Sequence, residues 1–127
     1  MVRRTLARRD GTVSNPNGAK GAEFERQVRD RFRYAGHRYA ERSYGAGRGD
    51  DVGDLSGILG GRVVIQCKNT AKIDLSGALD DAEVQRLNAR ADYAAVVQKR
   101  RGKNASRAYV IMDLDSFARL LKEIELA

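Results

Sequence analysis

A chain of 127 residues with 42% hydrophobic and 32% charged residues is long enough for one domain with a buried core, and its composition excludes a disordered protein. A single cysteine and a single histidine exclude a disulfide framework, a structural zinc site and a Cys/His protease, and they suit a reducing compartment, expected to be the cytoplasm. No apolar run approaches about 18 residues and the basic start lacks an apolar signal segment, so no membrane association is expected.

The net charge of +7 indicates a polyanionic partner, of which nucleic acid is the most common. Cationic side chains gather in two dense stretches, which favours contact with the phosphates of DNA or RNA, without base reading, over a surface that only keeps the chain soluble. The candidates for DNA contact are Arg3, Arg4, Arg8, Arg9, Lys20, Arg48, Lys72, Lys99, Arg100, Arg101, Lys103 and Arg107. Of these, Lys72 fits phosphate contact and simple solvation of a loop equally well.

The first part of the chain divides into a basic arm and a helix. Residues 1–18 are expected to form a flexible arm that ends in the turn-rich sequence SNPNG, and residues 19–127 are expected to form a single domain. A helix is predicted over residues 19–35, stopped by Gly36. Its apolar stripe for the core consists of Phe24, Val28, Phe32 and Ala35.

The middle of the chain predicts three strands joined by glycine-rich segments. Residues 37–44 alternate weakly between apolar and polar and are expected to form a strand, which the loop GAGRGDDVG follows. Residues 54–59 and 62–66 are expected to form a hairpin around Gly60-Gly61.

The second half predicts alternating helices and strands. In chain order we expect a helix over 76–91, a strand over 93–98, a basic turn over 99–107, a strand over 108–112 and a last helix capped by Asp113 or Asp115. The side chains expected to face the core are Leu79, Val84 and Leu87 in the first of these helices, and Phe117, Leu120, Leu121 and Ile124 in the last. The order α-β-β-β-α-β-β-α predicts an α/β fold with a mixed sheet.

The register of the hairpin decides which side chains share a face. A strict two-residue turn would place Asp54 opposite Cys67 and mix apolar with polar side chains on each face. An odd loop or one bulge instead gives one apolar face, with Leu55, Val63, Ile65 and Cys67, and one polar face, with Asp54, Gln66 and Lys68. Only the second register separates the two kinds of side chain, so Asp54 is predicted to lie opposite Gln66, and Cys67 to be a small core residue.

Asp54, Gln66 and Lys68 would then form a polar patch beside Glu25, which lies next to the apolar stripe of its helix. Hard divalent cations such as Mg²⁺ take oxygen ligands, usually one or two carboxylates plus waters. A lysine beside the ion can stabilise charge on an attacked phosphate or orient a nucleophilic water. Taken singly, each residue has an ordinary alternative: a turn aspartate, a solvated strand end, or a helix-surface acid that balances Arg29.

Two motifs resemble a known nuclease superfamily. Asp54 followed by the hairpin and by Gln66-Cys67-Lys68 resembles the D…(D/E)xK core of the PD-(D/E)xK nucleases. The sequence KGAEFER at residues 20–26 resembles the KGxxxER helix start of archaeal-type Holliday junction resolvases, with Glu25 as the matching acid. The resemblance covers about residues 20–112.

The resemblance implies a restriction-endonuclease-like three-layer fold, in which a central mixed β-sheet is flanked by helices. It implies Mg²⁺, with Mn²⁺ as a substitute, held by Glu25, Asp54, Gln66 and the backbone carbonyl of Cys67, with Lys68 as the catalytic lysine. It also implies a homodimer whose two sites act on DNA at four-way junctions. The expected function is therefore that of a Holliday junction resolvase in DNA recombination and repair.

Gln66 departs from this pattern, because resolvases of that type usually have glutamate there. The QxK form resembles Mrr-type restriction nucleases of the same superfamily, although this chain has no room for their additional DNA-reading domain. A neutral amide should weaken metal binding, but its oxygen can still coordinate. Two alternatives stay open: an Mrr-like or other branched- or duplex-DNA nuclease, and a catalytically inactive nucleic-acid-binding protein. Asp50 and Asp51, in the glycine-rich loop, are second choices as metal ligands.

Overall fold

The computed structural model describes residues 16–43 and 51–127. Several candidates of the sequence analysis lie outside these ranges, namely Arg3, Arg4, Arg8 and Arg9 of the arm and Arg48 and Asp50 of the glycine-rich loop. Within the described ranges, no helix is both long enough and apolar enough to cross a membrane.

The described residues form three helices and a five-stranded mixed sheet. In chain order the elements are α1 (Pro16–Tyr34), β1 (Glu41–Arg42), β2 (Leu55–Ile58), β3 (Val63–Lys68), α2 (Leu75–Ala89), β4 (Tyr93–Gln98), β5 (Tyr109–Ile111) and α3 (Leu114–Leu126). Two short 3-10 turns, η1 (Leu59–Gly61) and η2 (Ala105–Arg107), lie between β2 and β3 and between β4 and β5. The predicted order of helices and strands is confirmed, and with it the α/β class.

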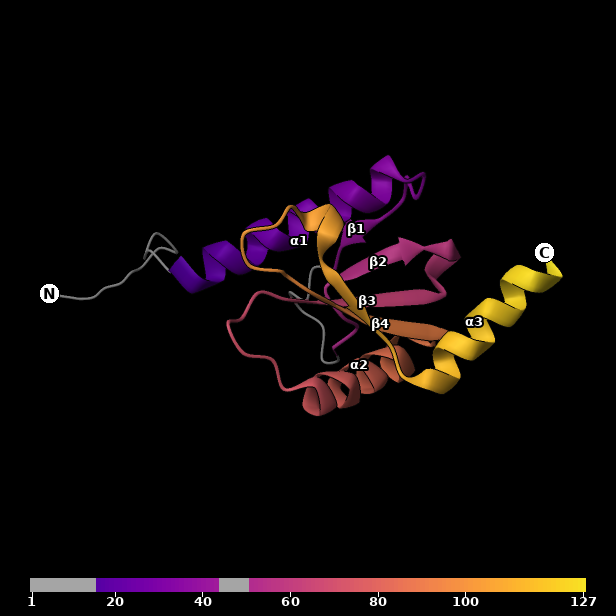
Figure 1. The fold of residues 1–127 in the computed structure, drawn as a ribbon. Coiled ribbons are helices and arrows are strands. Elements are labelled where there is room, and N and C mark those ends of the chain that lie inside the picture. The colour runs from indigo at the N-terminus through magenta and orange to yellow at the C-terminus, as the bar shows by residue number, and fades with distance from the viewer. Residues whose placement is uncertain (1–15, 44–50) are drawn as a thin grey trace, which may run out of the picture.

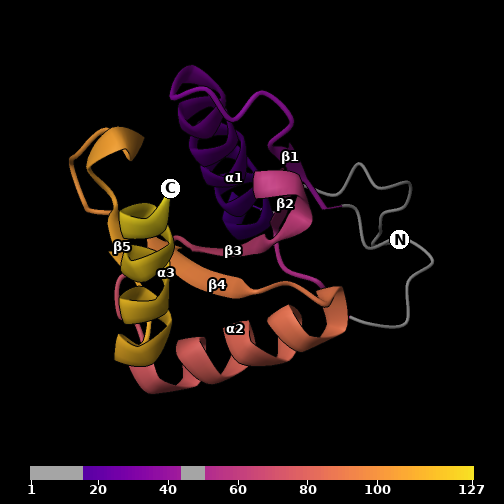
Figure 2. The same ribbon diagram turned by 90° about the vertical axis from the view of Figure 1, so that its right-hand side faces the viewer.

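The strands lie in the order β1-β2-β3-β4-β5. The first three are antiparallel neighbours, whereas β3 and β4 run parallel because α2 crosses over between them, and β5 returns antiparallel to β4. Helices α1 and α2 cover opposite faces of the sheet (Figures 1 and 2). The sheet is therefore the middle of three layers, and α3 packs against β4.

Helix α1 begins earlier than predicted. It starts at Pro16, inside the segment expected to be a turn, because proline is well suited to the first turn of a helix. It ends at Tyr34, and Gly36 follows with a φ of 109° that favours glycine. Phe24 and Val28 of its stripe are buried and Phe32 packs against them. The predicted core residue Ala35 is exposed instead, because it lies beyond the end of the helix.

Strand β1 is much shorter than the strand predicted over residues 37–44. Among residues 37–43, Glu41 and Arg42 are the two that pair with β2, and Tyr44 lies outside the described residues. The chain before them makes a turn, in which the amide of Ala40 donates to the carbonyl of His37 at 3.0 Å. The prediction was wrong there because a weak alternation of apolar and polar residues does not separate a strand from a turn.

A β-bulge sets the register of the hairpin. Leu55 pairs with Ile65, as predicted, but Ile58 pairs with Val63, so β2 carries one extra residue between the two pairs. Gly57 lies in this bulge with a φ of 80°, and an added Cβ there would lie 2.0 Å from the carbonyl oxygen of Tyr39. The bulge turns the apolar side chains of both strands toward α1, so Leu55, Ile58 and Ile65 are buried there.

The inward face of α2 differs from the predicted one. Ala78, Ala82 and Gln85 are buried, whereas the predicted core residues Val84 and Leu87 are 55% and 60% exposed. Small side chains on the inward face let the helix lie close to the sheet, where Ala78 and Ala82 pack on Val96 with Leu79 beside them. The prediction of a helix was right, but the face of α2 that packs against the sheet is not the face that carries its largest apolar residues.

Helix α3 also leaves its predicted core residues outside. Phe117, Leu121 and Ile124 are 47%, 48% and 64% exposed, whereas Leu120 is half-buried and Ser116 is buried. Polar contacts hold the helix instead, since Glu123 accepts hydrogen bonds from Arg62 and from the Tyr93 hydroxyl. Of the two cap candidates, Asp113 caps the helix by accepting from the amide of Ser116 at 2.8 Å.

Candidate active site

Asp54 is held at the start of β2 by backbone contacts with β3. Its amide donates to the carbonyl of Ile65 at 2.8 Å, and its carboxylate Oδ2 accepts from the amide of Cys67 at 2.8 Å. Gly53 permits this close approach, because its φ is 90° and a Cβ there would lie 2.3 Å from Cγ1 of Val64. The carboxylate is therefore fixed at the residue that separates Gln66 from Lys68.

The surroundings of Asp54 disfavour its charged form. The pKa of Asp54 is raised to about 6, mainly by burial and in smaller part by the carboxylates of Glu25 and Asp51. The Cys67 amide and the Lys68 ammonium act in the opposite direction but do not offset the burial. Asp54 therefore lies in a half-enclosed place with an excess of negative charge.

Glu25 reaches this place from α1. It is half-buried and forms an ion pair with Arg42 of β1, with 3.1 Å between Oε1 and Nε. The alternative partner Arg29 pairs with Asp30 instead, at 3.0 Å. Glu25 is thus a residue that faces the sheet, as its place beside the apolar stripe predicted, and not a surface acid balanced within its own helix.

Gln66 is held from the other face of the sheet. Its Oε1 accepts from Nε2 of Gln85 on α2 at 2.5 Å, and the same Nε2 donates to Oδ2 of Asp51 at 2.9 Å. Asn88 of α2 adds a bond to the backbone carbonyl of Asp51 at 2.8 Å. The second-choice candidate Asp51 is therefore attached to α2 through two side chains and lies close enough to Asp54 to affect its pKa.

Gln85 is the residue of this site that the sequence analysis missed. It is 2% exposed, and its own Oε1 is buried without a hydrogen-bond partner among the described residues. The available signal was its spacing from Ala78 and Ala82, which puts a glutamine on a face otherwise made of small residues. A buried amide on such a face needs polar partners, and Gln66 and Asp51 provide them.

Lys68 and Cys67 point to opposite faces at the end of β3. Cys67 packs against the cluster under α1, and burial raises the pKa of its thiol, with the charges of Asp54 and Glu25 adding to the effect. It is the small core residue that was predicted. The ammonium of Lys68 makes no hydrogen bond or ion pair with any residue in the described part of the chain, although it is near enough to Asp54 to lower that pKa.

The four candidate residues therefore meet at one end of the sheet and not on one patch of a single face. Glu25 comes from the α1 side, Gln66 from the α2 side, and Asp54 binds the backbone between them. Within residues 16–43 and 51–127, no three Asp, Glu, His or Cys side chains lie close enough together to form a metal site by themselves. An ion here would need the amide oxygen of Gln66 or ligands from outside the chain.

Some of the predicted cationic residues lie next to this end of the sheet. Lys20, Lys99 and Arg101 line a groove of about 460 Å³ between α1 and the turn after β4. The amide of Lys99 donates to the carbonyl of Lys68 at 2.9 Å, which joins the groove to β3. Lys103 lines a neighbouring hollow with Lys99.

The remaining cationic candidates lie elsewhere. Arg100 faces a separate cavity beside β5. Lys72 and Arg107 are exposed and line none of these hollows. The groove between α1 and the turn after β4 is thus the cationic surface nearest to the candidate site.

In comparisons with known proteins, no family model, no curated protein sequence and no solved structure matches this chain. The function of the site has to be inferred from the geometry and chemistry of its own residues.

Proposed function

We propose that this chain is a Mg²⁺-dependent, structure-selective DNA endonuclease that hydrolyses phosphodiesters at four-way junctions. One observation carries the proposal: the Asp54 carboxylate is fixed on the Cys67 amide at 2.8 Å, between Gln66 and Lys68 and beside Glu25. Two carboxylates, an amide oxygen and an ammonium are the groups that metal-assisted phosphodiester hydrolysis needs at one point.

The arrangement of layers supports the same proposal. A helix, three antiparallel strands, a crossover helix and a parallel strand follow one another along the chain, with the two helices on opposite faces (Figure 2). This order is compatible with the restriction-endonuclease-like fold that the motifs at Asp54 and at residues 20–26 imply. We propose that fold for the domain.

The residues present fit a Mg²⁺ ion. The raised pKa of Asp54 reflects burial next to Glu25 and Asp51, so a cation would relieve an existing repulsion. The oxygens of Glu25, Asp54 and Gln66, with the backbone carbonyl of Cys67, are hard ligands of the kind Mg²⁺ prefers, and water and substrate phosphate would complete the shell. Gln66 can accept from Gln85 and still offer a lone pair, because a carbonyl oxygen has two.

The residues of the site would have the following roles in catalysis. Asp54 and Glu25 hold the negative charge that attracts the ion, and the bond from Gln85 fixes the orientation of the Gln66 amide. Lys68, without a partner among the described residues, is available to neutralise charge on the phosphate and to orient the attacking water. When bound, Mg²⁺ supplies a polarised phosphate and a coordinated water of lowered pKa.

We propose that the protein recognises its DNA substrate by shape and not by base sequence. The groove with Lys20, Lys99 and Arg101 can follow a phosphate backbone, and backbone contacts alone carry no sequence information. A homodimer would supply the two sites that paired incisions across a junction require. We therefore propose four-way junctions as the substrate and a second copy of this chain as the partner.

A cleavage assay tests this proposal. The full chain is incubated with a four-way junction, a linear duplex and a flapped duplex, each in Mg²⁺, in Mn²⁺ and in EDTA. We expect cutting of the junction that depends on the metal and is lost in Asp54→Asn and Lys68→Ala, while junction binding in EDTA is kept. Lys122→Ala, a lysine on α3 that is paired with Glu125, is the matched control for loss of a positive charge and should cut normally.

The outcomes separate the alternatives. Equal cutting of all three substrates would replace the junction resolvase with a branched- or duplex-DNA nuclease of Mrr-like type. Tight binding with no cutting in either metal would favour the inactive nucleic-acid-binding protein, for which the Glu25–Arg42 ion pair and the neutral Gln66 are the supporting observations. Cutting retained in Asp54→Asn would show that the site lies elsewhere.

A further inference from the structure

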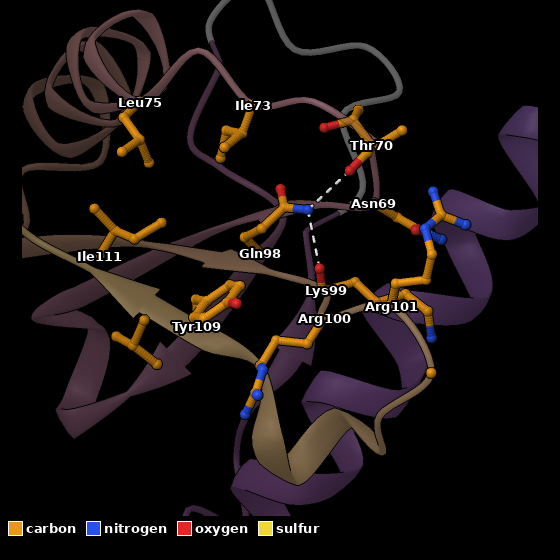
Figure 3. Close-up of a pocket in the computed structure, with 13 residues that line it drawn as sticks. Asn69, Thr70, Ile73, Leu75, Gln98, Lys99, Arg100, Arg101, Tyr109 and Ile111 are labelled. Atoms are coloured by element: carbon orange, nitrogen blue, oxygen red, sulfur yellow. Dashed lines mark hydrogen bonds between the residues drawn. The ribbon is translucent and has the colours of Figure 1, made fainter.

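A cavity of about 620 Å³ lies beside the candidate site, between the segment after β3 and the strands β4 and β5 (Figure 3). It is separate from the groove along α1, and the two hollows share only the lining residues Asn69, Lys99 and Arg101. Its size falls within the range of pockets that hold small organic groups. Nothing in the roles assigned so far uses it.

The floor of the cavity is the buried side chain of Gln98. It is 6% exposed, and its Nε2 donates to the carbonyls of Thr70 at 2.9 Å and of Lys99 at 3.0 Å (Figure 3). These two bonds fix the orientation of the amide. Its Oε1 is buried and has no donor among the described residues. A buried acceptor that no described residue supplies with a donor is suited to accept from an N–H group of a ligand.

The walls of the cavity suit a flat ring. Ile73, Leu75 and Ile111 form an apolar side, and Tyr109, a residue that is 55% exposed, stands near Gln98 (Figure 3). The guanidinium of Arg100 lies over the Tyr109 ring, 5.2 Å from its centre. Aromatic rings and guanidinium planes stack on nucleobases of any sequence.

The rim of the cavity is cationic. Lys99, Arg100 and Arg101 line it, and none of the described residues that line it is acidic. A planar ring that offers N–H groups and carries an adjacent negative charge matches this combination. A nucleobase with its phosphate has all three properties.

The position of the cavity connects it to the candidate site. Lys68 pairs with Gln98 across β3 and β4, and Gln98 pairs with Tyr109 across β4 and β5. The three side chains therefore stand in one row on the same face of the sheet, about 5 Å from one to the next. A strand of DNA with a phosphate at Lys68 would have an adjoining nucleotide at Gln98 and Tyr109.

From this row we infer that the cavity takes one unpaired nucleobase of the DNA strand next to the phosphate that is cut. The inference rests on the proposed function and extends it, since the substrate would need a base that can leave its stack and not only a junction of the right shape. Gln98 would accept from the base, and Tyr109 with Arg100 would stack on it.

Binding in EDTA tests the inference without any cutting. The full chain is titrated with a duplex that carries a one-nucleotide adenine bulge, with the same bulge as an abasic site, and with the fully paired duplex. We expect the adenine bulge to bind about tenfold tighter than the abasic one, the size expected for one base stacked on an aromatic side chain. Tyr109→Ala should bring this ratio close to one, whereas Tyr109→Phe should keep it.

Tyr39→Ala is the matched control. Tyr39 is 71% exposed and carries the guanidinium of Arg38 5.0 Å from its ring centre, so it repeats the pair of Arg100 and Tyr109 outside the cavity. This variant should leave the adenine-to-abasic ratio unchanged. Gln98→Met should lower the adenine-to-abasic ratio as Tyr109→Ala does. If the Gln98→Met variant fails to fold because Gln98 is buried, the variants of the exposed Tyr109 still test the inference.

Three results would overturn the inference. The first is equal binding of the adenine and abasic bulges by the wild-type chain. The second is saturable binding of free dAMP that Tyr109→Ala abolishes while the adenine-to-abasic ratio stays the same in that variant, because the cavity would then hold a free nucleotide. The third is a change of oligomeric state in Tyr109→Ala with the base ratio intact, because the cavity would then be a contact between copies.

The experiments can contradict the proposed nuclease function and the base-binding inference independently of each other. If the wild-type chain prefers the adenine bulge but never cuts DNA in Mg²⁺ or Mn²⁺, the base pocket stands and the nuclease proposal falls. If it cuts four-way junctions but shows no preference for the adenine bulge, the reverse is true.

Discussion

The carboxylate of Asp54 accepts a hydrogen bond from the backbone amide of Cys67 at 2.8 Å. This bond ties the first residue before β2 to the strand that carries Gln66 and Lys68, so the acid cannot move independently of either. It also holds an ionisable group in a buried place close to Glu25 and Asp51. The buried charge lowers stability, and under the proposed function it lies where a cation and a phosphate would meet.

The free energy of unfolding should therefore depend on the charge of Asp54. Because burial raises its pKa from 3.8 to about 6, its effect on metal-free stability is most favourable below pH 4 and is lost as the pH rises through 6. Asp54→Asn removes the charge and keeps an acceptor for the Cys67 amide, so it should stabilise the chain at pH 7.5 by about 2 to 3 kcal/mol.

Thermal melting in EDTA between pH 4 and pH 8 measures this effect. The difference in melting temperature between the variant and the wild type should grow between pH 4 and pH 6.5 and then level off. Asp80→Asn, at an exposed position of α2, is the control and should show no such trend. A variant less stable than the wild type at pH 7.5 would contradict the burial of a charged Asp54.

Gln66→Glu should strengthen metal binding. The change adds a negative charge next to Asp54, while Nε2 of Gln85 can still donate to the new carboxylate. More ligand charge raises affinity for divalent cations, so the Mg²⁺ concentration for half-maximal cutting should fall about tenfold. In EDTA the same variant should melt at a lower temperature, and Mg²⁺ should restore it. An unchanged Mg²⁺ requirement would show that residue 66 is not a ligand.

Gln85→Met should impair cutting without unfolding the chain. Methionine fills a similar volume but cannot donate to Gln66 or Asp51, and the substitution also removes the buried Oε1 that lacks a partner. Mutation of a residue that hydrogen-bonds a metal ligand usually lowers metal affinity or activity by about 10- to 100-fold. The Mg²⁺ requirement for junction cutting should rise, while the melting temperature and DNA binding in EDTA stay close to wild type. A lower melting temperature with a normal Mg²⁺ requirement would indicate a purely structural role.

DNA binding should weaken steeply as salt increases. Each phosphate contact contributes about −0.9 to the slope of log affinity against log salt concentration. Lys20→Ala and Arg101→Ala, on either side of the groove along α1, should each make the slope shallower by about one. Lys122→Ala on α3 should leave it unchanged. Fluorescence anisotropy at several salt concentrations gives these slopes, and equal slopes for all variants would remove the groove from the DNA path.

The sequence predicted the pairing of β2 with β3 and the place of Glu25 beside the sheet better than it predicted the packing of the helices. The spacing of Asp54, Gln66 and Lys68 follows the two-residue period of strands, and one bulge is enough to separate apolar from polar faces. Glu25 could be selected as a site candidate because the apolar stripe of its helix was known, and few residues lie at the edge of that stripe. These inferences depend on local geometry, which a short stretch of chain specifies.

The helices show where local inference fails. Val84 and Leu87 were predicted to face the core because they are large and apolar, yet Ala82 and Gln85 occupy that face. The choice depends on tertiary packing, in which the small side chains of Ala78 and Ala82 lie against Val96 of the sheet. The spacing of Gln85 from Ala78 and Ala82 indicated burial but not function, because its partners Gln66 and Asp51 lie on other elements.

By itself the sequence determined the alternation of helices and strands, the pairing of Leu55 with Ile65 and the cationic character of the surface. Only the tertiary structure decided that Lys68, Gln98 and Tyr109 form one row beside a cavity, and that Gln85 holds Gln66. The physical reason is the range of the interactions. Periodicity and turn chemistry act over a few residues, whereas strand order and the crossover of α2 bring together side chains that the linear sequence keeps far apart.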